Sequence, residues 1–402
     1  MAIDTLDPAM AAAEIPQRKA GASQAVVLLA ATTLPIMGVI SLVPVIPLLL
    51  QRFSTVPGAT YLVPLALVAP GLCIALLSPF MGMVADRIGR RSLLLTALAF
   101  YAAFGMVPLF LDHLGAIIIS RFGLGVTEAV IMTVTTTLTG DYFSAEDRQK
   151  WIGAQTAIGS LTATALFLTG GMLGSLGWQG PFYLYALAIP VLFAAIAFLW
   201  EPEASHHQLK RKGRPTSTFP WRAMVGICLT AAFCSVAFYA APLQLGVRLG
   251  EVGVVGAAAI GVTAGVASLG VPVGALLFRR TKSDVATLLA GVLLLIGVGL
   301  FGIGLGGSVG TIGAAMFINQ LGCGMMMPCL ITWCLSKLSF EHRGQGSGLW
   351  TSAFFMGQFF SPLIMTGLAD QGRGMATAFL IAGSITASSA VFVGAARWRR
   401  EA

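Results

Sequence analysis

The sequence predicts an all-α integral membrane protein with twelve transmembrane helices in two halves of six. Hydrophobic residues make up 56% of the 402 residues and charged residues only 10%. This composition is too apolar for a water-soluble core of ordinary proportions. Apolar runs long enough to cross a hydrocarbon layer of ~30 Å recur along the chain. The longest polar stretch between these runs falls in the middle of the sequence.

Each apolar run is expected to form one membrane-spanning helix. The first six helices are expected at 25–50, 60–84, 92–111, 115–139, 151–173 and 181–200. The second six are expected at 223–247, 253–278, 284–305, 309–336, 346–368 and 375–396. The polar stretch at 201–222 contains three prolines and is expected to be a linker. The remaining parts of the chain are an N-terminal tail (1–24), two bundles (25–200 and 223–396) and a C-terminal tail (397–402).

The distribution of basic residues predicts the orientation in the membrane. Of the 24 Lys and Arg residues, all but Arg52, Arg121, Arg248 and Arg373 fall on one side of the expected helices. The positive-inside rule places that side, with both termini, in the cytoplasm. The net charge of +8 therefore indicates topology and contact with anionic lipid. It gives no indication of nucleic-acid binding.

A short charged motif, GMVADRIGRR, lies between the second and third expected helices. Its glycines allow a tight turn, and its Asp and arginines concentrate charge at a helix end. Anchoring by the positive-inside rule alone would need neither an Asp nor a fixed glycine spacing. The motif residues are Gly82, Asp86, Arg87, Gly89, Arg90 and Arg91.

These residues resemble a known family. The pattern G-x-x-x-D-R-x-G-R-R after the second of twelve helices is similar to the signature loop of the major facilitator superfamily. In the first helix, Gly38, Pro44 and Pro47 match a G-x-x-x-x-x-P-x-x-P pattern of its twelve-helix drug:H⁺ antiporter branch. Arg121 and Gly125 match a fourth-helix R-x-x-x-G pattern. The second half contains a degenerate copy of the loop, GALLFRRTKSD. Such a copy is expected of pseudo-symmetric six-helix repeats.

The resemblance implies a carrier that works by alternating access. In such a carrier, two bundles rock about a central substrate site near the bilayer midplane. Asp86 and the loop arginines would latch the outward-facing state, with Asp141 as partner of the charge cluster. Pro44 and Pro47 would break the first helix. The resemblance implies no cofactor, and the partners expected are a small-molecule substrate, protons and membrane lipid. A monomer in the cell inner (plasma) membrane is expected.

Two ionisable residues, Arg121 and Glu128, fall inside the fourth apolar run. Seven residues turn a helix through about 700°, so both side chains share one face about 10 Å apart along the axis. Glu128 stands alone among the 16 Asp and Glu residues in being placed deep in the hydrocarbon. Burial of a carboxyl favours its protonated form. Glu128 is therefore the predicted proton-coupling residue, and Arg121 the predicted anion-binding residue.

A purely structural role for each side chain stays open. Arg121 would then donate to backbone carbonyls that the first-helix prolines release. Glu128 would sit neutral against Thr133, Thr135 or another polar neighbour.

Polar and aromatic side chains in other helices are expected to line the central cavity with Arg121. These candidate substrate-binding residues are Gln155, Tyr239, Gln244, Asn319, Gln320, Trp333, Trp350 and Gln358. Few fixed charges in the expected cavity favour an amphipathic or weakly anionic substrate over a polyhydroxylated sugar.

The predicted function is secondary transport of an amphipathic, organic-anion or drug-like solute, with proton-coupled efflux as the first hypothesis. The first helix lacks the acidic residue usual in the antiporter branch, and the fifth helix lacks its proline, so direction stays open. The alternatives are a proton-coupled organic-anion importer, a lysolipid exporter or a non-transporting receptor. An enzyme is not expected, because all four histidines fall in expected loops or helix ends. The cysteines also lack paired metal spacing, so no metal site is expected.

Overall fold

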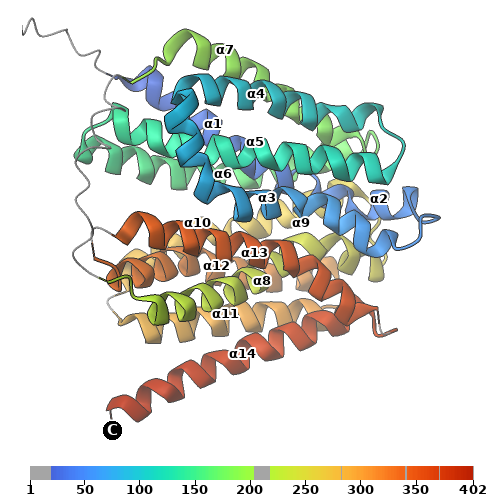
Figure 1. The fold of residues 1–402 in the computed structure, drawn as a ribbon. Helices are drawn as coiled ribbons and strands as arrows, with labels where there is room; N and C mark the ends of the chain where they lie inside the picture. The colour runs from blue at the N-terminus through green and yellow to red at the C-terminus, as the bar shows by residue number, and fades with distance from the viewer. Residues whose placement is uncertain (1–19, 203–217, 282, 340–341, 371, 402) are drawn as a thin grey trace, which may run out of the picture.

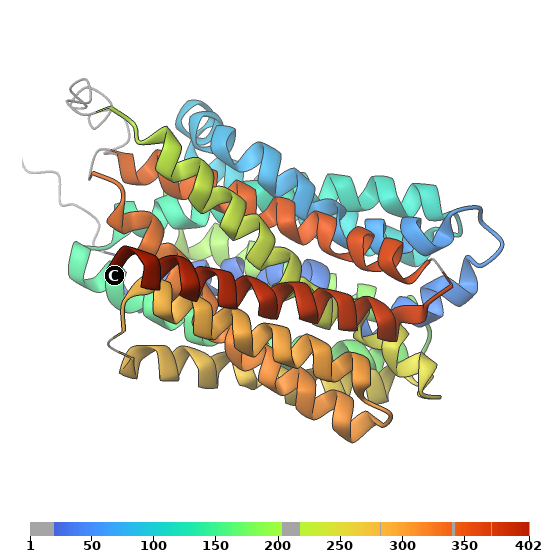
Figure 2. The same cartoon turned by 90° about the horizontal axis from the view of Figure 1, so that it is seen from below.

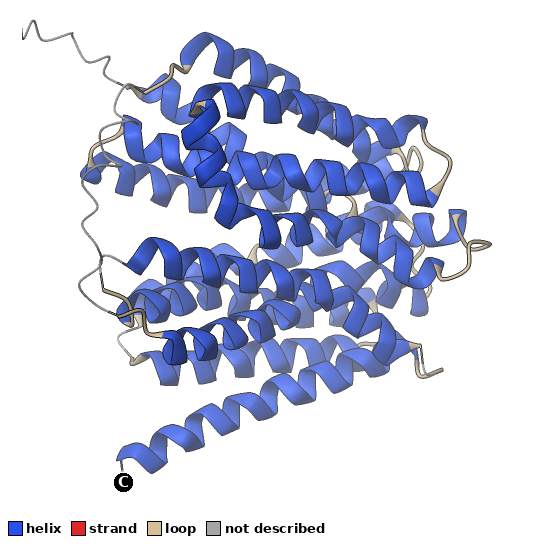
Figure 3. Ribbon diagram, in the orientation of Figure 1, coloured by secondary structure: helices blue, strands red, loops and turns tan. Residues whose placement is uncertain are grey.

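The computed structural model describes residues 20–202, 218–281, 283–339, 342–370 and 372–401. Within these ranges all regular structure is helical (Figure 3). Twelve segments of the described chain are long and apolar enough to span a membrane. The predicted fold class is therefore confirmed. Most of the predicted N-terminal tail (1–19) and of the linker (203–217) lies outside the described residues.

The first half of the chain forms six spans, the first of which is broken. Its helices are α1 (Ala22–Ile40), η2 (Val43–Val45), α2 (Ile46–Arg52), α3 (Ala59–Ile88), α4 (Arg90–Met106), η3 (Val107–Phe110), α5 (Leu114–Tyr142), α6 (Ala145–Gly174), η4 (Gly180–Leu187) and α7 (Ala188–Phe198). The second half forms the other six spans. Its helices are α8 (Trp221–Glu251), α9 (Ala257–Ser268), α10 (Gly270–Arg280), α11 (Val285–Leu305), α12 (Val309–Ser336), α13 (Arg343–Ala369) and α14 (Gly374–Glu401).

The break in the first span coincides with its prolines. α1 ends at Ile40, Pro44 lies in the 3₁₀ turn η2, and Pro47 lies in the first turn of α2. Proline has no N–H and cannot donate a helical hydrogen bond, but it is tolerated in a first turn, where the donor would have no partner. The chain therefore starts a new helical segment at Pro44 and again at Pro47, where the sequence predicted a break within one helix.

The two halves form two layers that lie against each other along the bundle (Figures 1 and 2). Each half encloses its own apolar core: Leu98 and Phe182 are buried in the first, and Leu300 and Met316 in the second. α3 of the first half packs against α13, and α6 packs against α9. α1 begins and α14 ends at one end of the bundle (Figure 1). We call this the linker end, and the opposite end the distal end.

Contacts between the halves gather toward the distal end. A Cβ atom placed on Gly171 of α6 would lie only 2.9 Å from the Cα atom of Gly261 in α9, so small residues let these helices touch. Near the start of α3, the Tyr61 hydroxyl donates a 2.8 Å hydrogen bond to Asp370, which follows α13. Backbone packing and a polar bridge thus join the two halves at the distal end.

Candidate functional site

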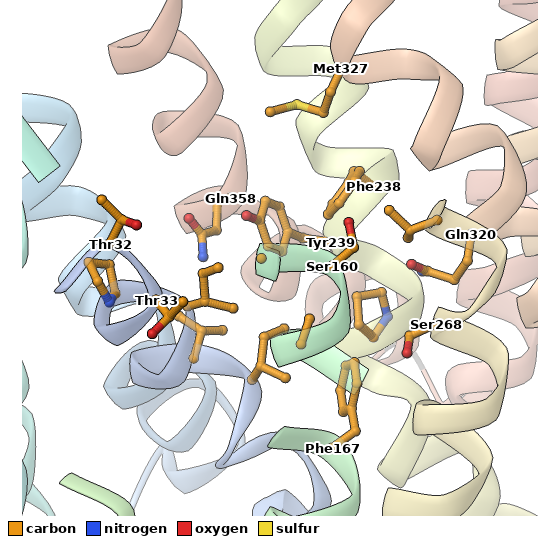
Figure 4. A pocket seen from close by; sticks show the side chains of 18 of the residues that line it. Thr32, Thr33, Ser160, Phe167, Phe238, Tyr239, Ser268, Gln320, Met327 and Gln358 are labelled. Atoms are coloured by element: carbon orange, nitrogen blue, oxygen red, sulfur yellow. The ribbon is translucent and has the colours of Figure 1, made fainter. Parts of the chain in front are cut away.

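A cavity of about 490 Å³ lies between the two halves. Its wall is contributed by α1, α6, α8, α10, α12 and α13, with Met132 from α5 and Ser268 from the end of α9 (Figure 4). Along α6 the wall runs from Gln155, nearer the linker end, to Phe167. The cavity therefore extends from the middle of the bundle toward the linker end, away from the Tyr61–Asp370 bridge.

The wall of this cavity is apolar and aromatic, with a few neutral polar groups. Its aromatic members are Phe167, Phe238, Tyr239 and Phe355. Among the described residues, no Lys, Arg, His, Asp or Glu lines it. Such a wall suits a ligand with a large apolar surface and few polar groups.

Hydroxyl groups in the wall are largely used within the protein. Thr32 donates to Leu29 O at 2.8 Å, and Thr33 donates to Ala30 O at 2.7 Å. Ser268 in turn donates to Gly265 O at 2.7 Å. Because each of these hydroxyls donates its hydrogen to a helix carbonyl, it can only accept a hydrogen bond from a ligand.

Arg121 lies behind this cavity and is fully buried in the first half. Its Nε donates to Ala66 O at 3.1 Å, its Nη1 donates to the Tyr185 hydroxyl at 2.6 Å, and its Nη2 donates to Gly38 O. Its guanidinium also lies over the Tyr185 ring. These three hydrogen bonds hold the guanidinium within the first half, and Arg121 does not line the cavity.

The sequence explains why those carbonyls are available. In a helix, Ala66 O would accept from the N–H four residues later, but that residue is Pro70, which has none. The Leu42 N–H donates to Val39 O in the 3₁₀ turn that ends α1, and so leaves Gly38 O free of it. Arg121 replaces these missing donors. The sequence-based alternative, a purely structural role for Arg121, predicted donation to freed backbone carbonyls. It attributed their release to Pro44 and Pro47.

Glu128 lies on the same face of α5, and its side chain is 1% exposed. Its Oε1 has no hydrogen-bond partner among the described residues. The carboxyl presses against Gly38, where a Cβ atom would collide with it. Thr135, a partner considered from the sequence, donates to Ile131 O instead. Arg121 and Glu128 therefore meet at Gly38, one on its carbonyl and the other on its Cα.

The predicted cavity residues separate into two groups. Gln155, Tyr239, Gln320 and Gln358 line the cavity. The other four candidates lie outside the lining of this cavity.

Gln244 donates to Pro362 O and Thr366 Oγ1, both at 3.2 Å, beside a smaller cavity of about 220 Å³ at the distal end. Asn319 donates to Ile296 O at 3.3 Å. Trp350 stacks on Phe354, with ring centroids 5.5 Å apart. Trp333 packs against the core of the second half.

The charged loop motif forms a cluster within the first half. Arg90 donates to Asp86 at 2.9 Å and also pairs with Asp141, so the expected partner of the cluster is present. Gly89 has φ +101°, a backbone conformation that only glycine adopts readily. Gly82 has open space around it, Arg87 is exposed, and Arg91 donates to Ile196 O at 2.9 Å.

Comparison with known proteins decides the family. A family model described as the Major Facilitator Superfamily matches residues 28–349. The chain belongs to the Major Facilitator Superfamily. It is therefore a multi-pass membrane transporter and not an enzyme, and the family is the one that the loop motif resembles.

Curated relatives in this superfamily are tetracycline resistance proteins. The class D protein of Salmonella ordonez is 31% identical over 185 residues, which is 44% of this chain and 45% of the relative. The class C protein of Escherichia coli is 29% identical over 222 residues, or 53% of this chain and 54% of the relative. The chain thus spans about half the length of the curated relatives it matches.

Solved structures of this superfamily share the fold at low sequence identity. A bacterial homolog of the human lysosomal transporter Spinster, in an inward-facing and occupied conformation, is 16% identical with a TM-score of 0.70. The match covers 94% of this chain and 96% of that structure. The human organic anion transporter MFSD10 (TETRAN) is 16% identical with a TM-score of 0.68, over 92% and 99% of the two chains. At this identity the likeness shows the fold alone.

Sequence reasoning missed three residues that hold this superfamily member together. Glu201, just after α7, accepts from Arg90 N at 2.6 Å and Arg91 N at 2.8 Å and so caps α4. Glu251 likewise accepts from Met375 N at 2.5 Å at the start of α14. Arg248 donates to Ile303 O, Gly304 O and Gly306 O at the end of α11. Their position at helix ends was visible in the sequence, but their partners were not.

The described residues contain no group of three or more His, Cys, Asp or Glu side chains placed to hold a metal ion.

Proposed function

We propose that this transporter is a proton-coupled efflux carrier for a small aromatic amphiphile. It would sit in the cell inner membrane as a monomer, with both termini in the cytoplasm. The observation that supports this most is the buried carboxyl of Glu128, whose Oε1 is unpaired among the described residues, behind a cavity whose described wall has no charged side chain. The tetracycline resistance proteins among its relatives agree with export of an aromatic drug.

The geometry suggests how proton and cargo would compete. Glu128 presses on Gly38 from one side of α1, while Val39 and Ile40 line the cavity on the other. Loss of a proton from Glu128 creates a charge in a low-dielectric site, which is unfavourable unless the surroundings rearrange. A cargo that presses on α1 from the cavity and a proton on Glu128 would therefore act on the same helix segment.

The state of the structure fits the first step of export. Its main cavity extends toward the linker end, and its halves are bridged at the distal end. With the linker end in the cytoplasm, as the basic residues predict, this is an inward-facing conformation. The Asp86–Arg90–Asp141 cluster lies within the first half here. In the proposal it would exchange partners and latch the halves when the cytoplasmic side closes.

The organic-anion and lysolipid alternatives receive less support. An anion in the cavity would need a cationic partner, but Arg121 is absent from the wall, and each of its side-chain nitrogens already donates within the protein. A sugar-like solute would need more hydrogen-bonding groups than the wall offers.

Proton movement in energised inverted membrane vesicles tests the proposal. Their interior is acidic, so export of a drug into the vesicle in exchange for protons should make the interior more alkaline. Tetracycline, an organic anion and a lysolipid would each be added while a pH-sensitive dye is read. The control is Glu146→Gln, because Glu146 is an exposed acid whose only described ion pair is with Lys150 at the surface.

Wild type and Glu146→Gln should respond to the aromatic drug, and Glu128→Gln should not. A response that survives Glu128→Gln would place coupling elsewhere. A response to the organic anion or the lysolipid alone would favour those alternatives, and no response to any compound would favour a receptor or an uncoupled carrier.

A further inference from the structure

The cavity wall contains an amide that the protein itself leaves unpaired. Gln358 of α13 is 3% exposed, and its Oε1 is buried without a hydrogen-bond partner among the described residues. That oxygen faces α3, where a Cβ atom on Gly71 would lie 3.1 Å away. The amide nitrogen points into the cavity beside the Tyr239 side chain (Figure 4). Gln358 thus holds a donor toward the cavity that no described group uses.

Several other polar groups of the wall already make hydrogen bonds within the protein. Gln320 Nε2 donates to Asn319 Oδ1 at 3.2 Å, and Asn319 in turn donates to Ile296 O. This chain fixes the Gln320 amide and leaves its oxygen as the group turned to the cavity (Figure 4). The threonine hydroxyls of α1 are used on their own helix. On the wall of the second half, Gln358 thus turns a donor and Gln320 an acceptor to the cavity, while the amide of the first half is Gln155 of α6, nearer the linker end.

The absence of charge in the described wall sets the second requirement. A charged cargo would lose its hydration without gaining a counter-ion, which is strongly unfavourable. Aromatic side chains from α6, α8 and α13 offer flat apolar surface instead. A ligand that fills the cavity removes water from this donor, and a donor left unpaired is then unfavourable, so such a site favours ligands that satisfy it over isosteres that cannot.

We propose that Gln358 is the specificity-determining residue of the cavity, and that its amide selects uncharged aromatic molecules carrying a carbonyl or comparable hydrogen-bond acceptor. This inference rests on the proposed transport function and narrows its substrate class. In this proposal the coupling carboxyl lies in the first half, and the residue that recognises the cargo lies in the second half.

A matched pair of probes tests the inference on the purified full chain in detergent. 9-Fluorenone and fluorene have nearly the same size and shape, but only the ketone has an acceptor oxygen. Wild type should bind tritiated 9-fluorenone about fivefold more tightly than fluorene, the range expected for a neutral hydrogen bond. In Gln358→Leu the two affinities should become equal, with fluorene binding unchanged.

A charge-introducing variant adds a result that a merely structural role would not produce. Gln358→Glu should bind the aromatic cation tetraphenylphosphonium more tightly than wild type does. Gln51→Leu serves as the control, because it removes an exposed amide at the distal end of α2 and should keep the wild-type preference. If Gln358→Leu does not fold, Gln358→Met provides the same comparison with an unbranched side chain.

A wild type without preference for the ketone would overturn the inference, and so would a Gln358→Leu that keeps the preference. These results are separate from the fate of the proposed function, because binding in detergent requires no proton gradient. Gln358 could still select the ketone while proton movement survives Glu128→Gln. That pair of results would support the recognition site and contradict Glu128 as the coupling residue.

Discussion

At the scale of single residues, the contacts around Gly38 bring Arg121, Tyr185 and Glu128 together. Its carbonyl accepts from Arg121 and from Tyr185, and its Cα faces the Glu128 carboxyl. Arg121 thus acts as a replacement for helix donors that the break in α1 and the residue Pro70 remove. The two ionisable side chains deep within α5 have different environments: each side-chain nitrogen of Arg121 donates a hydrogen bond, whereas one oxygen of Glu128 has no partner among the described residues.

Arg121→Lys should therefore reduce stability more than it changes cargo binding. A lysine keeps the charge but cannot donate to Ala66 O, Gly38 O and the Tyr185 hydroxyl in the same fork geometry. A buried carbonyl left unpaired costs about 1–3 kcal/mol, so the thermal unfolding temperature in detergent should fall by several degrees. Arg279→Lys, at an exposed position of α10, should leave it unchanged. A stable Arg121→Lys with weakened ligand affinity would contradict this reading.

Gly38→Ala should impair proton coupling, because its methyl group would collide with the Glu128 carboxyl and push α1 and α5 apart. We expect slower ligand-driven proton movement in vesicles, at unchanged expression. Gly226→Ala is the matched control, since a Cβ atom at Gly226 of α8 meets nothing within 4 Å. Equal rates for both variants would show that the contact at Gly38 is not used in transport.

At the scale of helices, charged side chains near helix ends join elements far apart in sequence. Glu201 caps α4 from the end of α7, and Arg248 satisfies the last carbonyls of α11. The first N–H and last C=O groups of a helix have no partner within it. A carboxylate at the N-terminus and a cation at the C-terminus also suit the helix dipole. These contacts tie together helices within each half.

Glu201→Ala should loosen the turn between α3 and α4, because two backbone N–H groups lose their acceptor. Loss of a helix cap costs about 0.5–2 kcal/mol, so we expect a lower unfolding temperature and greater protease sensitivity near Gly89. Glu146→Ala, at an exposed position in the first turn of α6, should show little change. Equal stability of the two variants would argue against a capping role for Glu201.

The sequence predicted elements better than it predicted their contacts. Apolar runs identified the twelve spans because hydrocarbon thickness fixes helix length, and Glu128 was singled out as the lone acid within them. The adjacent residues Asn319 and Gln320 show the limit. Both are polar and were both assigned to the cavity, yet only Gln320 lines it. Which side of a helix faces the cavity depends on the neighbouring helices, which no local pattern reveals.

At the scale of the whole molecule, two halves meet around a cavity that extends to one end and are bridged at the other. Alternating access requires the distal contacts to open when the linker end closes. The Tyr61–Asp370 hydrogen bond crosses between the halves at the distal end, so it stabilises the state in which that end is closed. A ligand or mutation can shift the balance only by changing the free energy of one state relative to the other.

Tyr61→Phe should therefore increase the population in which the distal end is open. Spin labels at Ser54 in the first half and Val255 in the second, in a cysteine-replaced background, would report the distance between the halves. We expect a larger fraction of long distances in Tyr61→Phe. Tyr183→Phe removes the hydroxyl of an exposed tyrosine in η4 and should match wild type. Unchanged distances in Tyr61→Phe would show that the bridge has no gating role.

Competition between cargo and proton at Glu128 can be measured as proton release on cargo binding. Purified protein in weakly buffered detergent solution would receive 9-fluorenone, which is uncharged and has no titratable group, while the pH is recorded, with wild type and Glu128→Gln compared at equal ligand occupancy. If cargo and proton compete through α1, wild type should release protons on binding and Glu128→Gln should not. Equal release by both proteins, or binding by wild type without release, would contradict the assignment of Glu128 as the coupling residue.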